Sequence, residues 1–486
     1  MKNSALFTDF YSLTMAQGYW KRGMNQRAVF EVIFRRQPFG GGFSIFAGLG
    51  TLVNELSSFA FSAEDLEYLK SLGLFEMDFL EYLRSFRFGG SLWAVDEGIV
   101  IFPQEPILRI DGSLIECQII EGLVLNIINF QSLVATKTAR VYLASGMGQL
   151  MEFGLRRAQG FDGALSASRA AYIGGAAGTS NVLAGKKFGI PVMGTMAHSW
   201  VMAFSGEEAA FQAYADLYPD NSVFLIDTYD TLRSGIVNAI KVGKRLAARG
   251  KNFGVRLDSG DIQYLSVEVR KALDEAGLPK ATIAVSNDLD EYIIQALTDA
   301  KAPVNSWGVG TQMVTGRPEA AFTGVYKLAA RENEDGILEA SMKLSDNPEK
   351  TTNPGVKQVW RIRDHKNMFV ADIMTLDDKE KNDLIEKGKD YTFWHPQTDY
   401  RHFSHTLAGN AEALLKKILE KGKALYPEPS LKTIKLRAVE NLKSLDQSYK
   451  RILNPHIYKV SISTRLRSLK LELIKSFLGD LSSLTI

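Results

Sequence analysis

The feature that most constrains the fold is an alternation of short apolar runs and amphipathic helical segments that begins near residue 148. Each repeat covers roughly 25–40 residues, the length of a strand–helix unit. The apolar runs predict strands at 150–153, 190–193, 223–226, 253–257, 282–285 and 304–309. The segments between them predict helices at 205–218, 230–248, 262–276 and 288–300. Strand–helix repetition of this kind predicts a parallel sheet, either open or closed into a barrel.

Glycine and polar residues follow every predicted strand of this region. These segments are 154–157, 194–199, 227–230, 256–261, 286–288 and 308–311. Parallel-sheet proteins bind their ligands at the edge where the carboxyl ends of the strands meet. The sequence therefore predicts a functional site at that edge.

His198 is the first candidate for chemistry at this edge. It is the only histidine between residues 1 and 364, and it follows a predicted strand that ends at Gly194. A core histidine satisfied by one hydrogen bond is the alternative interpretation. Asp227 and Asp230 follow the next strand. A carboxylate that accepts from one imidazole nitrogen fixes the tautomer and leaves the other nitrogen as base or nucleophile, which predicts a His–Asp pair.

Two further strand ends are suited to phosphate. Gly310 and Thr311 offer backbone N–H groups and a hydroxyl, and Ser286 and Asn287 stand where a helix begins. Glycine after a strand is also ordinary turn chemistry. Together the two segments predict adjacent phosphate sites.

Arginines flank the same edge, and arginine matches carboxylate or phosphate in a bidentate manner. Arg156 follows the first strand, whereas Arg256 and Asp258 alternate along the fourth. Arg256 and Asp258 form either a structural ion pair or a functional set. In a functional set the arginine binds an anionic substrate and the aspartate binds a ribose hydroxyl or a metal ion.

The remaining chain predicts three parts. Residues 1–125 predict an α+β domain, 126–340 the α/β barrel, and 341–486 a C-terminal segment that packs back on both. Within these parts the patterns predict helices at 4–20, within 52–86, and at 115–137, 416–425 and 466–477, and strands at 28–34, 98–102 and 107–110. His395, His402 and His405 lie close in sequence, but no cysteine or carboxylate completes a ligand set, so we expect no metal site there.

Composition excludes several classes of protein. Lys and Arg total 57 against 55 Asp and Glu, a net charge of +2 without a field for nucleic acid. No apolar run approaches the roughly 18 residues of a membrane span. The N-terminal residues carry no secretory pattern, and the single cysteine, Cys117, excludes an internal disulfide. A cytoplasmic location is expected.

Four motifs, at 8–15, 152–159, 194–199 and 254–261, together resemble the nicotinate phosphoribosyltransferase family. The resemblance is close from Thr8 to about Leu328 and looser at 454–461. It implies an irregular, incomplete α/β barrel of the type II phosphoribosyltransferase kind with an additional α+β domain. It also implies a homodimer with shared active sites. The implied reaction is nicotinate plus phosphoribosyl pyrophosphate giving nicotinate mononucleotide and pyrophosphate in NAD biosynthesis, coupled to hydrolysis of ATP with Mg²⁺.

The resemblance also implies roles for single residues. His198 resembles the histidine that ATP phosphorylates, and Asp227 resembles its orienting carboxylate. Thr195 and Arg256 resemble contacts to nicotinate. Tyr11 resembles an aromatic residue that stacks on the pyridine ring from the other subunit, with Phe153 on the opposite face. The positions that resemble contacts to the phosphoribosyl donor are Arg156, Asp258, Ser286, Asn287, Gly310 and Thr311.

Three alternatives remain open. Nicotinamide-using relatives carry an aspartate where this chain has Ser180, so Ser180 favours nicotinate. A quinolinate-using relative would not need the histidine motif. A barrel that binds nucleotide without catalysis would have no reason to keep His198, Asp227, Arg256 and Asp258 together, and barrel folds alone do not decide function.

Overall fold

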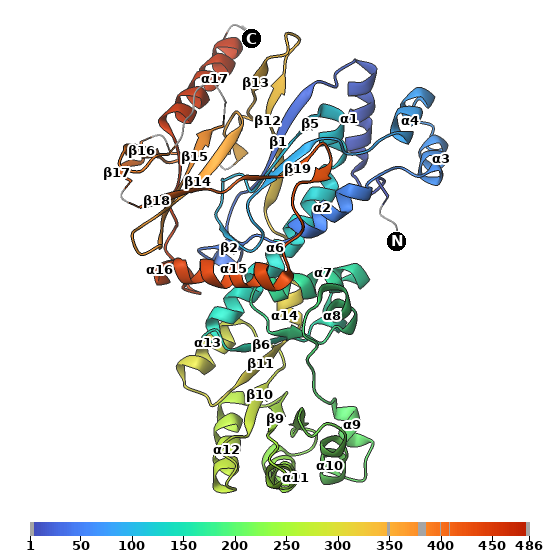
Figure 1. The fold of residues 1–486 in the computed structure, drawn as a ribbon, viewed down its shortest axis with the longest axis vertical. Helices are drawn as coiled ribbons and strands as arrows, with labels where there is room; N and C mark the ends of the chain where they lie inside the picture. The colour runs from blue at the N-terminus through green and yellow to red at the C-terminus, as the bar shows by residue number, and fades with distance from the viewer. Residues whose placement is uncertain (1–3, 348–349, 378–384, 399, 408, 483–486) are drawn as a thin grey trace. The chain divides into compact units, whose positions relative to one another are not determined.

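The computed structural model describes residues 4–347, 350–377, 385–398, 400–407 and 409–482. The chain divides into two compact units, shown in Figure 1. Unit 1 comprises Met1–Leu133 and Ala321–Ile486, and unit 2 comprises Val134–Ala320. The three-part division at 125 and 340 stays a prediction.

Unit 2 is built on a six-stranded parallel sheet with the order β7-β6-β11-β10-β9-β8. Its strands are β6 (Gln149–Glu152), β7 (Gly178–Thr179), β8 (Ser222–Leu225), β9 (Phe253–Leu257), β10 (Thr282–Val285) and β11 (Ser306–Val309). Its longer helices are α7 (Gly160–Ile173), α8 (Val182–Phe188), α10 (Glu207–Leu217), α11 (Ile236–Ala248), α12 (Ile262–Glu275) and α13 (Glu291–Asp299). Shorter helical turns are η2 (Leu155–Arg157), α9 (His198–Met202), η3 (Thr231–Gly235) and α14 (Thr311–Val314).

Helix α11 packs closely on the sheet of unit 2 at a glycine. Helices α11 and α12 contact strand β9 (Figure 1). A Cβ at Gly243 of α11 would lie 2.2 Å from Cζ of Phe253 in β9, so only glycine permits this approach. The strands themselves are almost wholly buried, which explains their continuous apolar runs. The parallel sheet predicted from the repeat is confirmed, and so is the incomplete α/β barrel that the family resemblance implies.

One predicted strand of unit 2 is wrong. Residues 190–193 form only an isolated bridge, between Val192 and Thr179. Thr179 exchanges two backbone hydrogen bonds with this segment, donating to the Pro191 carbonyl and accepting from the Met193 amide. Proline has no N–H to extend a ladder, so the pairing stops there.

Unit 1 contains a seven-stranded sheet of order β13-β12-β1-β5-β3-β19-β20 and a six-stranded sheet of order β17-β16-β21-β15-β14-β18. The strands of the first sheet are β1 (Arg27–Phe34), β3 (Ser91–Ala94), β5 (Leu108–Ser113), β12 (Gly324–Glu332), β13 (Leu338–Ala340), β19 (Lys416–Glu420) and β20 (Lys423–Ala424). Those of the second are β14 (Lys357–Arg363), β15 (Phe369–Leu376), β16 (Asp390–Trp394), β17 (His402–Thr406), β18 (Asn410–Ala413) and β21 (Val460–Ile462). Strands β2 (Ser44–Ile45) and β4 (Val100–Ile101) form a separate pair.

Helices accompany these sheets, so unit 1 is the predicted additional α+β domain. They are α1 (Phe10–Lys21), η1 (Pro38–Gly40), α2 (Leu49–Ser58), α3 (Ala63–Ser71), α4 (Met77–Arg84), α5 (Leu114–Ile119), α15 (Leu431–Ser444), α16 (Gln447–Lys450) and α17 (Thr464–Ser482). The predicted helix 115–137 is divided between α5 and α6 (Glu121–Ala144). Within the described residues, no helix combines the length and apolar character needed to cross a bilayer.

A second prediction fails in unit 1, where residues 416–425 form a hairpin instead of a helix. Lys421 and Gly422 both have positive φ, 49° and 71°, and they make the turn between β19 and β20. Strand β19 pairs with β3, which buries Leu419. The helix predicted at 466–477 is confirmed within α17.

Candidate active site

The candidate site lies at the carboxyl edge of the unit 2 sheet. Asp227, Asp258 and Ser286 follow β8, β9 and β10, which are neighbours in the sheet. Because parallel strands end at one edge, Asp227 and Ser286, which are 59 positions apart in sequence, both form hydrogen bonds with Asp258. The expectation that these strand ends meet is confirmed.

Arg256 is the centre of a hydrogen-bond network at this edge. Its Nε donates to Ser286 Oγ at 2.9 Å, and its Nη1 donates to Thr195 Oγ1 and to the Met196 carbonyl at 3.2 Å. Its Nη2 lies 3.3 Å from Asp258 Oδ1, which also accepts from Ser286 Oγ. Only 14% of the Arg256 side chain is exposed, so the charge-assisted bonds fix the guanidinium in a shielded position.

His198 stands at the first position of helix α9, facing two polar neighbours. Its Nδ1 lies 3.1 Å from Thr228 Oγ1, and its Nε2 lies 3.7 Å from Asp258 Oδ2. The side chain is 40% exposed, so solvent and ligands reach the imidazole. A carboxylate facing Nε2 favours the tautomer with the proton there and leaves the Nδ1 lone pair toward Thr228.

Asp227 binds the backbone turn after β9. Its Oδ2 accepts from the Asp258 amide at 3.1 Å and from the Ser259 hydroxyl. Its Oδ1 is buried and has no hydrogen-bond partner among the described residues. In this structure the imidazole therefore faces Thr228 and Asp258, whereas Asp227 holds the segment that carries Asp258.

Phe153 packs against Gly308 of β11 and against Gly310, which follows that strand. The Phe153 amide donates to the Val309 carbonyl at 2.8 Å. A Cβ at Gly308 would lie 2.6 Å from Phe153 Cδ2, so glycine is required for the ring to lie over the strand. Gly310 precedes helix α14, which begins at Thr311, and a Cβ at Gly310 would lie 3.1 Å from the Phe153 carbonyl oxygen.

The other predicted residues occupy different settings. Arg156 is exposed on η2, and Asn287 follows Ser286 with a φ of 79°, a conformation that is uncommon for a residue with a side chain. Ser180 follows β7 at the same sheet edge, and its amide donates to the Glu152 carbonyl. Tyr11 belongs to unit 1, on α1. Partial burial and the neighbouring Glu121 carboxylate raise the pKa of its phenol to about 12.

Glu152 is a site residue that the sequence interpretation missed. It is 1% exposed, and its carboxylate accepts from the hydroxyls of Ser168 and Thr179 and from the Gly154 amide. These bonds fix the turn that carries Phe153. A carboxylate inside the apolar run 150–153 was the available signal, because a buried charge must be hydrogen-bonded.

The donor set also fits a magnesium ion that accompanies phosphates. Mg²⁺ is usually bound by one or two carboxylates together with phosphate oxygens and water. Asp227 accepts from the Asp258 amide, and Asp227 Oδ1 has a lone pair that no described residue uses.

The three histidines near the C-terminal part of the chain lie elsewhere. His402 and His405 lie in β17, and His395 follows β16. Among described residues, no three His, Cys, Asp or Glu side chains are grouped to hold a metal.

Comparison with known proteins places this arrangement in one family. Three family models match: the nicotinate phosphoribosyltransferase N-terminal domain at residues 6–129, the nicotinate phosphoribosyltransferase family at 148–370, and its C-terminal domain at 356–470. A Bacillus subtilis protein named nicotinate phosphoribosyltransferase is 44% identical over 97% of this chain and 95% of its own length.

Two solved structures are similar as well. The crystal structure of human nicotinic acid phosphoribosyltransferase has a TM-score of 0.83 and 32% identity, covering 96% of this chain and 99% of that one. A nicotinate-nucleotide pyrophosphorylase from Pyrococcus furiosus has a TM-score of 0.69 at 21% identity, over 90% and 95% of the two chains, and shows a shared fold. The barrel with its additional domain and the matches along nearly the whole chain lead to one assignment. The chain belongs to the nicotinate phosphoribosyltransferase family.

Proposed function

We propose that this chain transfers the phosphoribosyl group of phosphoribosyl pyrophosphate to nicotinate, forming nicotinate mononucleotide and pyrophosphate for NAD biosynthesis. We further propose that ATP hydrolysis is coupled to this transfer through a phosphohistidine at His198. The observation that carries the proposal is the network of Arg256, Asp258, Ser286 and His198 at one sheet edge. The matching family members bear the name of this activity.

Recognition of nicotinate needs a cation for the carboxylate and an aromatic face for the ring. Arg256 supplies the cation, and Thr195 lies against the same guanidinium nitrogen. Phe153 supplies one aromatic face beside Gly308. Ser180 leaves this sheet edge without the extra carboxylate that would attract an amide and repel an acid.

The donor is highly charged, and the remaining polar groups suit it. Ser286, Asn287, Gly310 and Thr311 follow the neighbouring strands β10 and β11, where backbone N–H groups and hydroxyls meet phosphate. Arg156 adds an exposed guanidinium after β6. Mg²⁺ held by Asp227 and Asp258 would neutralise phosphate charge.

His198 can act as a nucleophile once Thr228 releases the Nδ1 lone pair. The nitrogen attacks the γ-phosphorus of ATP, the bond to the β-phosphate oxygen breaks, and ADP leaves with that oxygen. Asp258 opposite Nε2 stabilises the positive charge that develops on the imidazole. The phosphoryl group later passes to water, which restores the imidazole and yields phosphate.

The proposal includes a homodimer in which Tyr11 completes the site of the partner subunit. Helix α1 presents Phe10, Tyr11 and Met15 with 54%, 47% and 38% exposure, and Phe7, two residues before its N-cap Asp9, is 53% exposed. Apolar residues gathered in this way are typical of a protein interface. Sedimentation of the wild type and of Phe10→Glu tests the dimer.

The central experiment incubates the full chain with γ-labelled ATP and Mg²⁺ and measures acid-labile label. Label that disappears in His198→Ala but persists in His365→Ala, an exposed histidine in unit 1, supports the phosphohistidine. Absence of label on folded protein refutes that step. Formation of nicotinate mononucleotide is measured in parallel with and without ATP.

Substrate choice is tested with nicotinate, nicotinamide and quinolinate. The proposed specificity is supported if nicotinate is turned over and neither nicotinamide nor quinolinate is. Ser180→Asp should lower kcat/KM for nicotinate and leave that for nicotinamide equal or higher, because the added carboxylate repels one ring substituent and accepts from the other. If no pyridine substrate turns over, the chain is a binding barrel and the proposed catalysis is wrong.

A further inference from the structure

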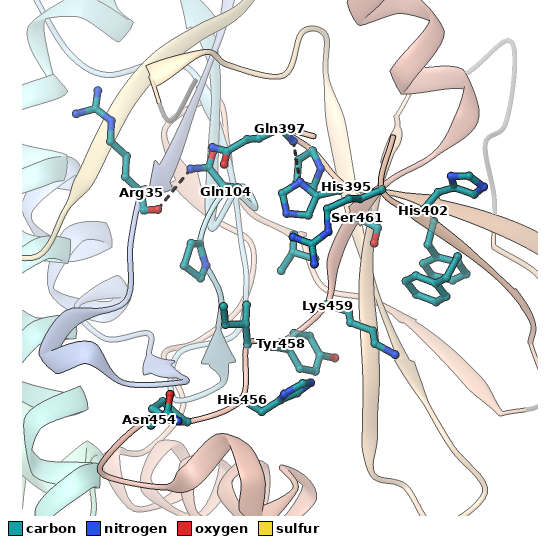
Figure 2. Close-up of a pocket in the computed structure, with 18 of the residues that line it drawn as sticks. Arg35, Gln104, His395, Gln397, His402, Asn454, His456, Tyr458, Lys459 and Ser461 are labelled. Atoms are coloured by element: carbon teal, nitrogen blue, oxygen red, sulfur yellow. Dashed lines mark hydrogen bonds between the residues drawn. The ribbon is translucent and has the colours of Figure 1, made fainter. Parts of the chain in front are cut away.

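A cavity of about 760 Å³ lies within unit 1. It is bounded by the segment 454–461 that leads into β21, by the ends of β16 and β17, and by the turn at Gln104. Figure 2 shows Asn454, His456 and Tyr458 on one side of it and His395 and Gln397 on another. None of the candidate active-site residues lines it. Its volume is within the range of small-molecule sites.

The lining of this cavity is strongly cationic. It includes the cationic side chains of Arg401, Arg451 and Lys459, together with the imidazoles of His395, His402 and His456. Among the described lining residues there is no aspartate or glutamate. Arg35 contributes its carbonyl, which accepts from Gln104 at 3.4 Å, whereas its side chain extends away from the other labelled residues in Figure 2.

The three arginine and lysine side chains of this set are not neutralised by carboxylates. In the described part of the chain, Arg401, Arg451 and Lys459 make no ion pair. Arg451 Nε donates only to the Ser448 carbonyl at 3.3 Å, and Lys459 Nζ lies 4.9 Å from the centre of the Phe403 ring. All three residues are exposed, so their remaining donors are available to a ligand.

The buried floor of the cavity does not supply the missing negative charge. Tyr458 donates to Asp372 Oδ1 at 3.0 Å, and Asp372 forms an ion pair with Arg361 at 2.6 Å. Burial and the neighbouring Asp372 raise the pKa of Glu105 well above its usual range, which disfavours a negative charge on Glu105. One carboxylate is thus balanced by one guanidinium, and the basic rim remains uncompensated.

Neutral donors complete the lining. His395 Nδ1 accepts from the Gln397 amide at 3.2 Å, which places the imidazole proton on Nε2. Burial and the positive charge of Arg401 lower the pKa of His395, so this imidazole is a neutral N–H donor at pH 7. The Gln397 Nε2 atom is buried without a hydrogen-bond partner among the described residues. A buried amide donor of this kind is costly unless a ligand or water accepts from it.

We propose that this cavity binds a small phosphate-bearing anion at a site separate from the candidate active site. Arginine and lysine donors that surround a concave space suit the several oxygens of a polyphosphate. A nucleoside polyphosphate and a free inorganic polyphosphate share this chemistry.

The test uses hydrogen–deuterium exchange on the full chain, without Mg²⁺ and with EDTA, because exchange reports where the anion binds. Tripolyphosphate should slow exchange in 451–461, and added salt should weaken that protection. Arg401→Ala/Lys459→Ala should raise the concentration for half-maximal protection roughly tenfold or more, since two charged contacts are removed. The matched control, Lys70→Ala/Lys432→Ala, removes two exposed lysines of the same unit and should leave the concentration for half-maximal protection unchanged.

Each outcome bears on the proposal. Protection confined to 308–311 in unit 2, or equal protection in the double variant, would overturn it. If the double variant changes exchange throughout unit 1 without ligand, the single variants Arg401→Gln and Lys459→Gln are tested instead. Each should raise the concentration of tripolyphosphate for half-maximal protection of 451–461, and no rise in either would overturn the proposal. Protection by ATP at lower concentration than tripolyphosphate would assign the site to nucleotides. Equal or weaker protection by ATP would assign it to the phosphate chain alone.

Discussion

The buried ion triad of unit 2 gives a quantitative stability prediction. Glu291, the first residue of α13, binds Lys137 and Arg140 of α6, and these three side chains are 0%, 1% and 2% exposed. Glu291→Gln keeps the shape but removes the carboxylate that pairs with both cations. Breaking a buried pair costs about 3–5 kcal/mol, because an uncompensated charge stays in the interior. We expect Glu291→Gln to lower the free energy of unfolding by about that amount.

Urea unfolding followed by tryptophan fluorescence measures this loss. With a slope of about 2–3 kcal/mol per molar urea, the midpoint should fall by roughly 1–2.5 M. The control is Glu208→Gln, since Glu208 also bridges a lysine and an arginine, Lys241 and Arg245, but on the surface. The control should change the midpoint little. A loss below about 1 kcal/mol in Glu291→Gln would refute the reasoning.

The pH dependence of the same variant provides a second check. Burial lowers the pKa of Lys137, and Glu291 opposes that effect. A lysine with a depressed pKa in the folded state destabilises the fold at low pH, and the cost disappears above its unfolded pKa of about 10.4. Without Glu291 the depression is larger. The deficit of Glu291→Gln should therefore shrink as pH rises toward 10.

Three further predictions concern single contacts. Ser286→Ala removes the hydroxyl shared by Arg256 and Asp258 and should lower kcat/KM of the proposed reaction by roughly 10- to 100-fold. Ser222→Ala deletes a buried hydroxyl at the opposite end of β8 and should leave kcat/KM unchanged. Equal losses of kcat/KM in the two variants would contradict the assignment of Ser286 to the site. Gly308→Ala should displace the Phe153 ring and raise KM for nicotinate about tenfold or more, whereas Gly163→Ala, with open space around it, should leave KM unchanged. Burial lowers the pKa of Lys435 to about 8. Lys435→Met should therefore raise Tm at pH 7 and lose that advantage between pH 8 and about 10.4, and a pH-independent difference would exclude this cause.

The strand–helix repeat predicted most of unit 2 because its period is set by burial on both faces of a parallel sheet. The strand ends then brought Asp258, Ser286 and Arg256 together without further assumptions. The neighbours of the His198 imidazole could not be obtained in this way. Asp227 and Thr228 are adjacent in sequence, and only the three-dimensional path after β8 decides which one reaches the ring.

Two local errors have different physical origins: pairing with a distant strand overrides the local pattern at 416–425, whereas a proline limits the pairing of 190–193. Residues 416–425 carry four lysines among apolar residues, which predicts an amphipathic helix, yet β19 within this segment pairs with β3 more than 300 positions away. The run 190–193 looks like a strand, but Pro191 limits it to a bridge. Glu152 was missed because its partners, Ser168 and Thr179, come from later segments.

The bonds of Arg256 to the segment before His198 have a thermodynamic consequence. Nη1 of Arg256 holds Thr195 and Met196, which lie between the last bridge residue, Val192, and helix α9. An anion that takes this nitrogen must compete with those two acceptors and so loosens the tether of the imidazole. Linkage is reciprocal, so a group that changes the position of His198 must change the affinity of Arg256 for its anion by the same factor. Binding of an anion at the Arg256 guanidinium and the position of the His198 imidazole are therefore coupled, and measuring either one reports on the other.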